Sequence, residues 1–331
     1  MSSSKDRQNA IKKLKALCLG PKVSLPVFRE KLEHTFATAL LPNRVECSER
    51  DFGGVPCDML VPEVYSSKRI MLYVHGGSFV GGSRAGWRSF CASLAHAASC
   101  RVVVPEFRIP TPHQYPASLE DVQSVFRAVY TEEQVARSLD AGSADAVPEI
   151  ILAADGSGAS IALALALSLK GKFRSVITRI VLFSPWLDVS TGSKRLNAKK
   201  AGDEVYTADA IRRSAEFYTY LENRSNALVS PLLADAQNLR EFPPVYIQMG
   251  EKELFLDDAE QFQAKLVDAG NECQLDVWKG MMPCFQMADD FLSESHLAIE
   301  KIGHVITGRD ERRNESDTSI HLTLEKSLNG Y

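Results

Sequence analysis

The chain has 331 residues, of which 45% are hydrophobic and 24% charged, values that suit one or two globular domains with a buried core. A formal net charge of −4 gives no strong field for nucleic acid or an anionic membrane, and no apolar run is long enough to span a bilayer. The first residues show no secretory signal and the seven cysteines have no CxxC spacing, so we expect a cytoplasmic protein with free thiols and without a metal site or a cofactor.

The N-terminal part predicts two helices, at 5–18 and 26–40, because Pro26 suits a helix start and apolar residues such as Leu32 and Phe36 recur near helical spacing. From about residue 55 onward, short apolar runs rich in β-branched residues alternate with helical stretches. The expected strands lie at 57–62, 69–76, 100–107, 149–156, 177–185, 243–250 and 273–280. The expected helices lie near 85–98, 117–130, 157–171, 208–221, 256–269 and 287–304.

This alternation predicts an α/β fold with a mostly parallel, twisted central sheet. The expected strands are apolar on both faces, which indicates that helices cover both sides of the sheet. The last residues, 307–331, are polar and rich in charge, so we expect a disordered tail there.

Four motifs follow one another in the order expected of a known enzyme group. They are "HGGSFVGGS" at 75–83, "FRIPTPHQYPASLEDV" at 107–122, the strand–turn–helix "ILAADGSGASIALALAL" at 151–167, and "FSPWLDVS" at 183–190 with the later "GEKELFLDD" and "DVWKGMMPCFQ". Together they resemble the hormone-sensitive-lipase branch of the α/β-hydrolase superfamily. The resemblance implies an α/β-hydrolase fold with a helical cap and a carboxylesterase or lipase type of site.

The resemblance also implies an organisation of the chain. Residues 1–50 would form an N-terminal helical cap segment, and 51–306 the α/β-hydrolase core with a cap insertion near 192–225. In this family the glycine loop supplies backbone N–H groups that hold the negative oxygen developing on an ester. Here those groups would come from Gly76, Gly77 and Ser78, joined by Ser157 from the turn.

The family's nucleophile is a serine in a small–x–Ser–x–small turn, because a sharp strand-to-helix turn tolerates no bulk beside it. Centring that pattern on Gly156 gives small flanks, Ala154 and Gly158, whereas centring it on Ser157 puts Asp155 at a flank. We therefore expect Gly156 to stand where the serine would be. Glycine also adopts the strained backbone of this turn without steric cost.

The other two members of the catalytic triad are also expected to be replaced. The acid should follow "IQMG" in a G-x-D-x-L context, which places Lys252 at its position. The histidine should lie in W-x-G-x-x-H-x-F, which places Pro283 at its position. A serine is a weak nucleophile until an oriented base takes its proton, so Gly156, Lys252 and Pro283 cannot perform this chemistry.

Three hypotheses for function remain from the sequence. The first is a catalytically degenerate family member that binds a small acyl or carboxylate ligand or has a regulatory role, with Lys252 adding a cation near the loop amides. The second is an active carboxylesterase that uses a displaced set such as Ser157, with His75, His113 or Cys284 as further candidates. The third is a scaffold that binds a protein, and the sequence leaves a homo-oligomer open.

Overall fold

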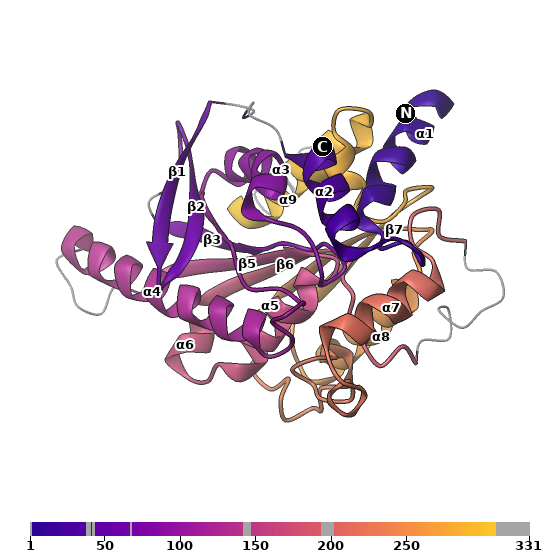
Figure 1. Cartoon of the computed structure of the whole chain (residues 1–331). Helices are drawn as coiled ribbons and strands as arrows, with labels where there is room; N and C mark the ends of the chain where they lie inside the picture. The colour runs from indigo at the N-terminus through magenta and orange to yellow at the C-terminus, as the bar shows by residue number, and fades with distance from the viewer. Residues whose placement is uncertain are drawn as a thin grey trace, which may run out of the picture.

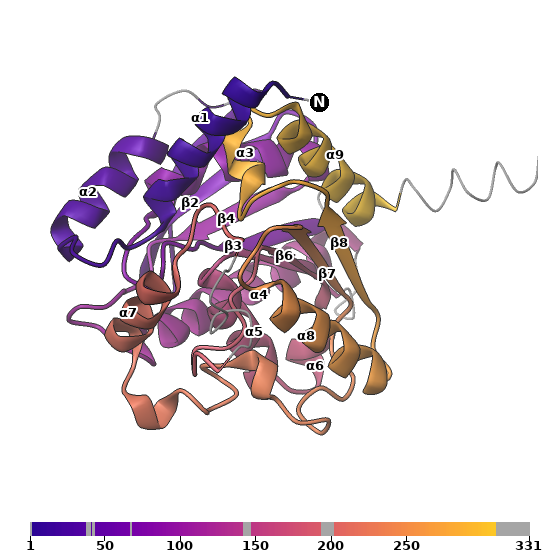
Figure 2. The ribbon, with the colours of Figure 1, turned by 90° about the vertical axis from the view of Figure 1, so that its right-hand side faces the viewer.

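The computed structural model describes residues 2–37, 41, 44–66, 68–141, 147–192 and 202–308. At its centre lies an eight-stranded sheet in the order β1-β2-β4-β3-β5-β6-β7-β8 (Figures 1 and 2). The strands are β1 Val45–Phe52, β2 Val55–Pro62, β3 Arg69–Val74, β4 Arg101–Pro105, β5 Glu149–Asp155, β6 Ile177–Phe183, β7 Val245–Gly250 and β8 Cys273–Trp278. The pairs β1–β2 and β2–β4 are antiparallel and the other five pairs are parallel, so the predicted mostly parallel sheet is confirmed.

Helices cover both faces of this sheet. The helices are α1 Ser4–Leu14, α2 Leu25–Phe36, α3 Arg84–Ala98, α4 Ala117–Ala141, α5 Gly158–Ser168, α6 Lys172–Ser175, α7 Ala208–Tyr218, α8 Leu256–Asp268 and α9 Ser293–Thr307, with 3-10 turns η1 Lys15–Leu17, η2 Leu221–Asn223, η3 Pro231–Leu233 and η4 Phe285–Ala288. α3 and α9 pack on one face, and α4, α5, α6 and α8 lie on the other (Figure 1). This double cover explains why central strands such as β5 and β7 are buried almost throughout.

Several elements differ from the sequence-based expectations, among them α6, which was not expected, and α2, which ends at Phe36. β1 was not expected, because its middle residues are polar and exposed, as suits an edge strand. α4 continues to Ala141, well beyond the predicted end near residue 130. The helix predicted at 287–304 is divided into η4 and α9, with the break before Ser293.

The boundary predicted at residue 51 falls inside β1. Because β1 already belongs to the sheet, the sheet begins at Val45, before the predicted boundary at residue 51. α1 and α2 lie beside each other near α3 and η4 (Figure 2). Residues 193–201 of the predicted insertion and 309–331 of the predicted tail lie outside the described residues.

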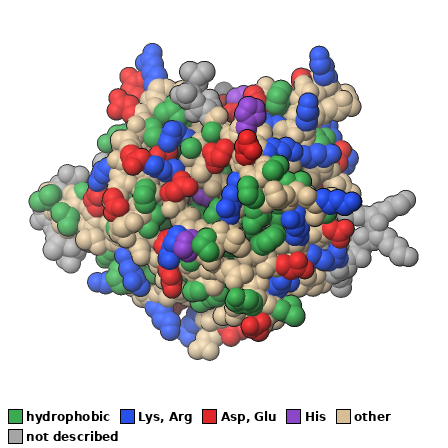
Figure 3. All heavy atoms as spheres, in the orientation of Figure 1, with side chains coloured by type: hydrophobic (Ala, Val, Ile, Leu, Met, Phe, Trp, Pro, Cys, Tyr) green, Lys and Arg blue, Asp and Glu red, His purple; other side chains and the backbone are tan. Residues whose placement is uncertain are grey.

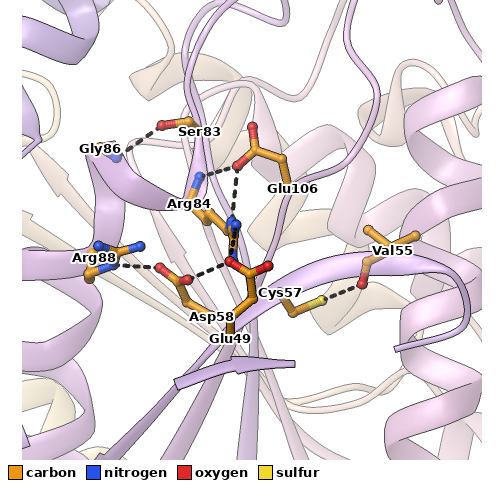
Figure 4. Close-up of polar contacts among 9 residues, drawn as sticks. All are labelled: Glu49, Val55, Cys57, Asp58, Ser83, Arg84, Gly86, Arg88 and Glu106. Carbon is orange, nitrogen blue, oxygen red and sulfur yellow. Dashed lines mark hydrogen bonds and ion pairs between the residues drawn. The ribbon is translucent and has the colours of Figure 1, made fainter. Parts of the chain in front are cut away.

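A buried ion-pair network ties the start of α3 to the antiparallel end of the sheet (Figure 4). Asp58 on β2 is 1% exposed, and its two oxygens accept from Arg84 at 3.0 Å and Arg88 at 2.6 Å. Arg84 also pairs with Glu49 on β1, and its backbone N–H donates to Glu106 at 2.9 Å. α3 starts directly after the glycine loop, so this network fixes the loop's exit.

On the face shown in Figure 3, basic and acidic side chains are interspersed. Of the helices in the described ranges, none is long and apolar enough to cross a bilayer. Within those ranges His, Cys, Asp and Glu side chains also form no cluster of three that could hold a metal ion.

Candidate active site

The turn between β5 and α5 is a sharp strand-to-helix turn with glycine at its tip. Gly156 has φ +46°, and its N–H donates to the carbonyl of Phe183 at 3.0 Å. Ser157 already has helical angles, φ −69° and ψ −25°. A Cβ placed on Gly156 would meet only the Tyr206 hydroxyl, at 3.9 Å. The tip therefore has room for a side chain, but the backbone conformation there favours glycine.

Gly156→Ser should lower the melting temperature, because a non-glycine residue at this positive φ costs about 1–2 kcal/mol. For a chain of this size that corresponds to about 1–3 °C. Gly202→Ser is the matched control, since Gly202 is exposed with open space around it and should leave the melting temperature unchanged. Differential scanning calorimetry of both variants measures the effect, and a rise for Gly156→Ser would contradict the strain argument.

Ser157 is directed into the structure. Its side chain is buried, and its Oγ accepts a hydrogen bond from the Phe79 N–H at 2.8 Å. This hydroxyl makes no capping hydrogen bond to α5. Ser157 thus joins the turn to the glycine loop.

The glycine loop packs against the turn through backbone contacts. The Gly76 N–H donates to Asp155 Oδ1 at 2.9 Å, so it is already occupied. Gly77 has φ +110°, and a Cβ there would lie 2.4 Å from the Gly81 carbonyl oxygen. Ser78 turns its hydroxyl to the Leu17 carbonyl at 2.7 Å. Among the described residues, no group accepts from the N–H of Gly77, Ser78 or Ser157, which leaves these amides, Gly77 and Ser157 among them, as donors for a ligand oxygen.

Asp155 holds the loop and the turn together. Its Oδ1 accepts from the Tyr73 hydroxyl at 2.8 Å and from Trp87 Nε1 at 2.7 Å, besides the Gly76 N–H. Burial raises the pKa of Asp155 to about 6, against these three donors, which lower it. The carboxyl is therefore a buried anchor whose charge is costly near neutral pH.

This raised pKa predicts how stability depends on pH. The folded protein favours the protonated form, so the contribution of Asp155 is present in full below the unfolded pKa near 4 and is lost as pH rises through 6. Between pH 4 and pH 7 the loss is about 2 kcal/mol. Asp155→Asn removes this ionisation. The unfolding free energy of the wild type minus that of Asp155→Asn should therefore fall by that amount over this range, measured by urea unfolding at both pH values. A difference that does not change with pH would contradict the assignment.

In the segment after β7, the neighbouring residues Lys252 and Glu253 differ in burial. Lys252 is exposed, and its charge helps to lower the pKa of Glu204, after the larger effect of the Arg7 hydrogen bond. Glu253 is instead 1% exposed, and its Oε1 accepts from the Ser184 hydroxyl at 2.8 Å and from the Gly250 N–H. Lys252 therefore lies at the surface, whereas the side chain of the neighbouring Glu253 is buried.

Pro283, which the sequence predicts to stand at the position of the family's histidine, lies buried in the loop after β8. The next residue, Cys284, has φ +53°, and its N–H donates to Ser184 Oγ at 2.8 Å. Burial raises the pKa of the Cys284 thiol well above its usual value, so the thiolate needed for nucleophilic attack is disfavoured. Neither residue supplies a base or a reactive nucleophile.

The two histidines named as candidates lie away from this chemistry. His75 is buried and stacks on Phe107 at 4.3 Å and lies beside Trp87 at 5.1 Å between ring centroids. Its Nδ1 contacts the Gly76 carbonyl, and burial lowers its pKa to about 4. His113 is exposed on the loop before α4. His75 is thus a packed loop residue, and the structure gives no contact between Ser157 and either histidine.

A chain of aromatic rings lies beside the turn, and sequence reasoning missed it. Phe79 stacks on Tyr218 at 3.9 Å and contacts Trp186 at 4.9 Å, and Trp186 stacks on Phe255 at 5.3 Å. Tyr206 continues the chain, 6.0 Å from Phe255, and carries the hydroxyl nearest to Gly156. These rings come from four separate segments, so no local pattern in the sequence marks them.

The N-terminal segment is bonded to the loops around the turn. Besides the contact of Ser78 with Leu17, Arg29 Nε donates to the Val80 carbonyl at 2.7 Å. Arg7 donates to the Gly280 carbonyl at 3.0 Å and pairs with Glu204. The N-terminal segment therefore bonds to both the glycine loop and the loop that contains Pro283, and so fixes the two loops relative to each other.

Comparison with known proteins finds similarity to α/β hydrolases, among them esterases. A family model described as an alpha/beta hydrolase fold matches residues 71–287. An esterase from Acinetobacter venetianus is 27% identical over 246 residues, which cover 74% of this chain and 77% of that protein. An acetyl-hydrolase from Streptomyces hygroscopicus is 28% identical over 235 residues, covering 71% and 74%. A crystal structure of an esterase from the bacterial hormone-sensitive lipase family has a TM-score of 0.78 at 25% identity and covers 92% of this chain and 98% of that one.

Proposed function

The chain belongs to the α/β-hydrolase fold family, in its hormone-sensitive-lipase branch, and on that premise we propose that it has lost ester hydrolysis and binds a small acyl ligand. The observation that carries the proposal is Gly156 at the tip of the turn, with φ +46° and no side-chain atom to attack an ester. Pro283 supports it, because proline has no group that can take a proton. The relatives above are named as esterases and an acetyl-hydrolase, and these two positions set this chain apart from a working triad.

The remaining features of the site favour a ligand with a carbonyl oxygen. The free amides of Gly77 and Ser157 can donate to such an oxygen, and the rings around Phe79 offer apolar contact to a short acyl chain. A neutral ligand is favoured over a carboxylate. The buried carboxyls of Asp155 and Glu253 both act on Cys284, after the larger effect of burial, so an anion here would meet like charge. Lys252 is too exposed to offset them.

We expect the purified protein to hydrolyse p-nitrophenyl acetate and butyrate at a rate near background, with Ser157→Ala no different from wild type. The reason is that Ser157 Oγ is already bonded to the loop and has no base. Spectrophotometric release of p-nitrophenolate measures it. Turnover above about 1 s⁻¹ that Ser157→Ala abolishes would overturn the proposal and establish the displaced esterase instead.

The thermal response to ligands separates a binding protein from a scaffold. Binding to the native state alone raises its stability, by about 2.7 kcal/mol at a ligand concentration of 100 Kd. We expect methyl butyrate to raise the melting temperature and sodium butyrate to leave it unchanged. No response to either compound would favour a protein-binding scaffold.

A further inference from the structure

The hydroxyl of Tyr206 is a buried polar group at the tip of the turn. Tyr206 is 8% exposed, and its hydroxyl oxygen lies 3.9 Å from the position that a Cβ on Gly156 would take. Its backbone N–H donates to Asp203, but among the described residues no group makes a hydrogen bond with its hydroxyl. Because a buried hydroxyl without a partner lowers stability, this one is suited to an acceptor that arrives with a ligand.

We propose that the Tyr206 hydroxyl recognises the ligand, and that this acyl ligand carries a second acceptor oxygen, a hydroxyl, close to its carbonyl group. The ligand class is then the esters of hydroxy acids. This inference rests on the proposed acyl binding and adds a specificity that the loop amides and the aromatic rings alone do not give.

The second oxygen follows from the balance of donors and acceptors in the site. A carbonyl oxygen has two lone pairs, and the free N–H groups of Gly77 and Ser157 suffice to occupy both. Tyr206 is a further donor, so a simple acyl group leaves its hydroxyl without an acceptor. A hydroxyl on the ligand supplies two more lone pairs and remains neutral.

The surroundings of Tyr206 favour a neutral ligand that can also donate a proton. The groups that act on it electrostatically are the thiols of Cys284 and Cys18 and the carboxyls of Asp155 and Asp203. Burial, the largest cause, raises the pKa of Tyr206 well above its usual value, and these acidic groups raise it further. The phenol therefore stays protonated and donates. A ligand hydroxyl can accept from it and donate to a neighbouring acidic group, whereas a carboxylate would meet like charge.

Contacts with the segment after β7 hold Tyr206 in place. Asp203 Oδ1 accepts from the N–H groups of Val205 and Tyr206, both at 2.8 Å, and its Oδ2 accepts from the Leu254 N–H at 2.9 Å. The ring of Tyr206 lies 6.0 Å from that of Phe255. The hydroxyl is thus positioned before a ligand binds, which reduces the entropy lost on binding.

The test compares methyl 3-hydroxybutyrate with methyl butyrate, which lacks only the hydroxyl, by ligand-observed NMR titration of the full-length protein. We expect the wild type to bind the hydroxy ester about fivefold more tightly, as one added hydrogen bond allows, and Tyr206→Phe to abolish this preference. Tyr220→Phe is the matched control, since Tyr220 is 63% exposed, and it should keep the preference. Equal binding of both esters by the wild type, or a preference that survives in Tyr206→Phe, would overturn the inference and leave acyl binding standing. Binding of neither ester would overturn the proposed function itself.

A second readout needs no ligand. Without ligand, Tyr206→Phe should leave the melting temperature unchanged or raise it, because no hydrogen bond is lost. Tyr73→Phe gives the contrast, since the Tyr73 hydroxyl donates to Asp155 at 2.8 Å, and it should lower the melting temperature by about 2–4 °C. Differential scanning calorimetry measures both variants. A fall for Tyr206→Phe as large as that for Tyr73→Phe would show that the Tyr206 hydroxyl already has a partner within the protein, and would overturn the inference.

Discussion

Asp58→Asn should destabilise the protein by about 3 kcal/mol, because it removes the charge that compensates two arginines in a buried network. Asp58 is 1% exposed, and its oxygens bind Arg84 at 3.0 Å and Arg88 at 2.6 Å (Figure 4). Asparagine keeps the shape and can accept one hydrogen bond, but its amide nitrogen faces the second guanidinium as another donor. Urea unfolding measures the loss.

Glu49→Gln provides a matched control in the same network. Glu49 also pairs with Arg84, but its side chain is 68% exposed, so water screens the pair and replaces the lost contact. We expect a cost below about 1 kcal/mol. If Asp58→Asn cost no more than Glu49→Gln, burial would not be what makes this network important, and the exit of the glycine loop would be held by something else.

The difference between buried and exposed residues also explains which strands the sequence could predict. Central strands such as β5 and β7 are apolar on both faces, so their residue types alone mark them. β1 escapes this rule, because an edge strand with polar residues at Glu46 and Ser48 has the composition of a loop. Its pairing with β2 depends on register between two segments, which composition does not encode.

The candidate site was predictable only where local geometry dictates residue type. A turn with positive φ selects glycine, so Gly156 can be placed from its small neighbours. Lys252 and Glu253 are adjacent, and nothing local decides which of them faces inward. That choice depends on Ser184, a partner from a distant segment, which donates to Glu253 together with the nearby Gly250 N–H.

The aromatic chain and the Asp155 anchor were missed for the same reason. The donors to Asp155 come from Tyr73 and Trp87, more than sixty residues away along the chain. Contacts of this kind have no period and no fixed spacing. They can be recognised only after the sheet has brought β3, α3 and β5 together.

Gly158→Ala shows how far tertiary contact can override local preference. Gly158 is the first residue of α5, where alanine favours the helix by about 1 kcal/mol over glycine, so local propensity predicts stabilisation. A Cβ there would lie 2.2 Å from the Val74 carbonyl oxygen and 2.4 Å from that of His75. These are backbone atoms at the end of β3, where the glycine loop starts, and they cannot rotate away. We expect a net loss of about 3 kcal/mol in urea unfolding.

Gly202→Ala separates this clash from any general effect of a methyl group. Gly202 is exposed and has no atom near the position of a Cβ, so its replacement should change stability by less than about 0.5 kcal/mol. A Gly158→Ala variant as stable as wild type would mean that the glycine loop can shift away from the turn. The free amides of Gly77 and Ser157 would then have no fixed relation, and the proposed acyl site would lose its basis. A large loss would mean instead that close backbone packing holds loop and turn together, although the glycine at position 156 carries no side chain that could act as a nucleophile.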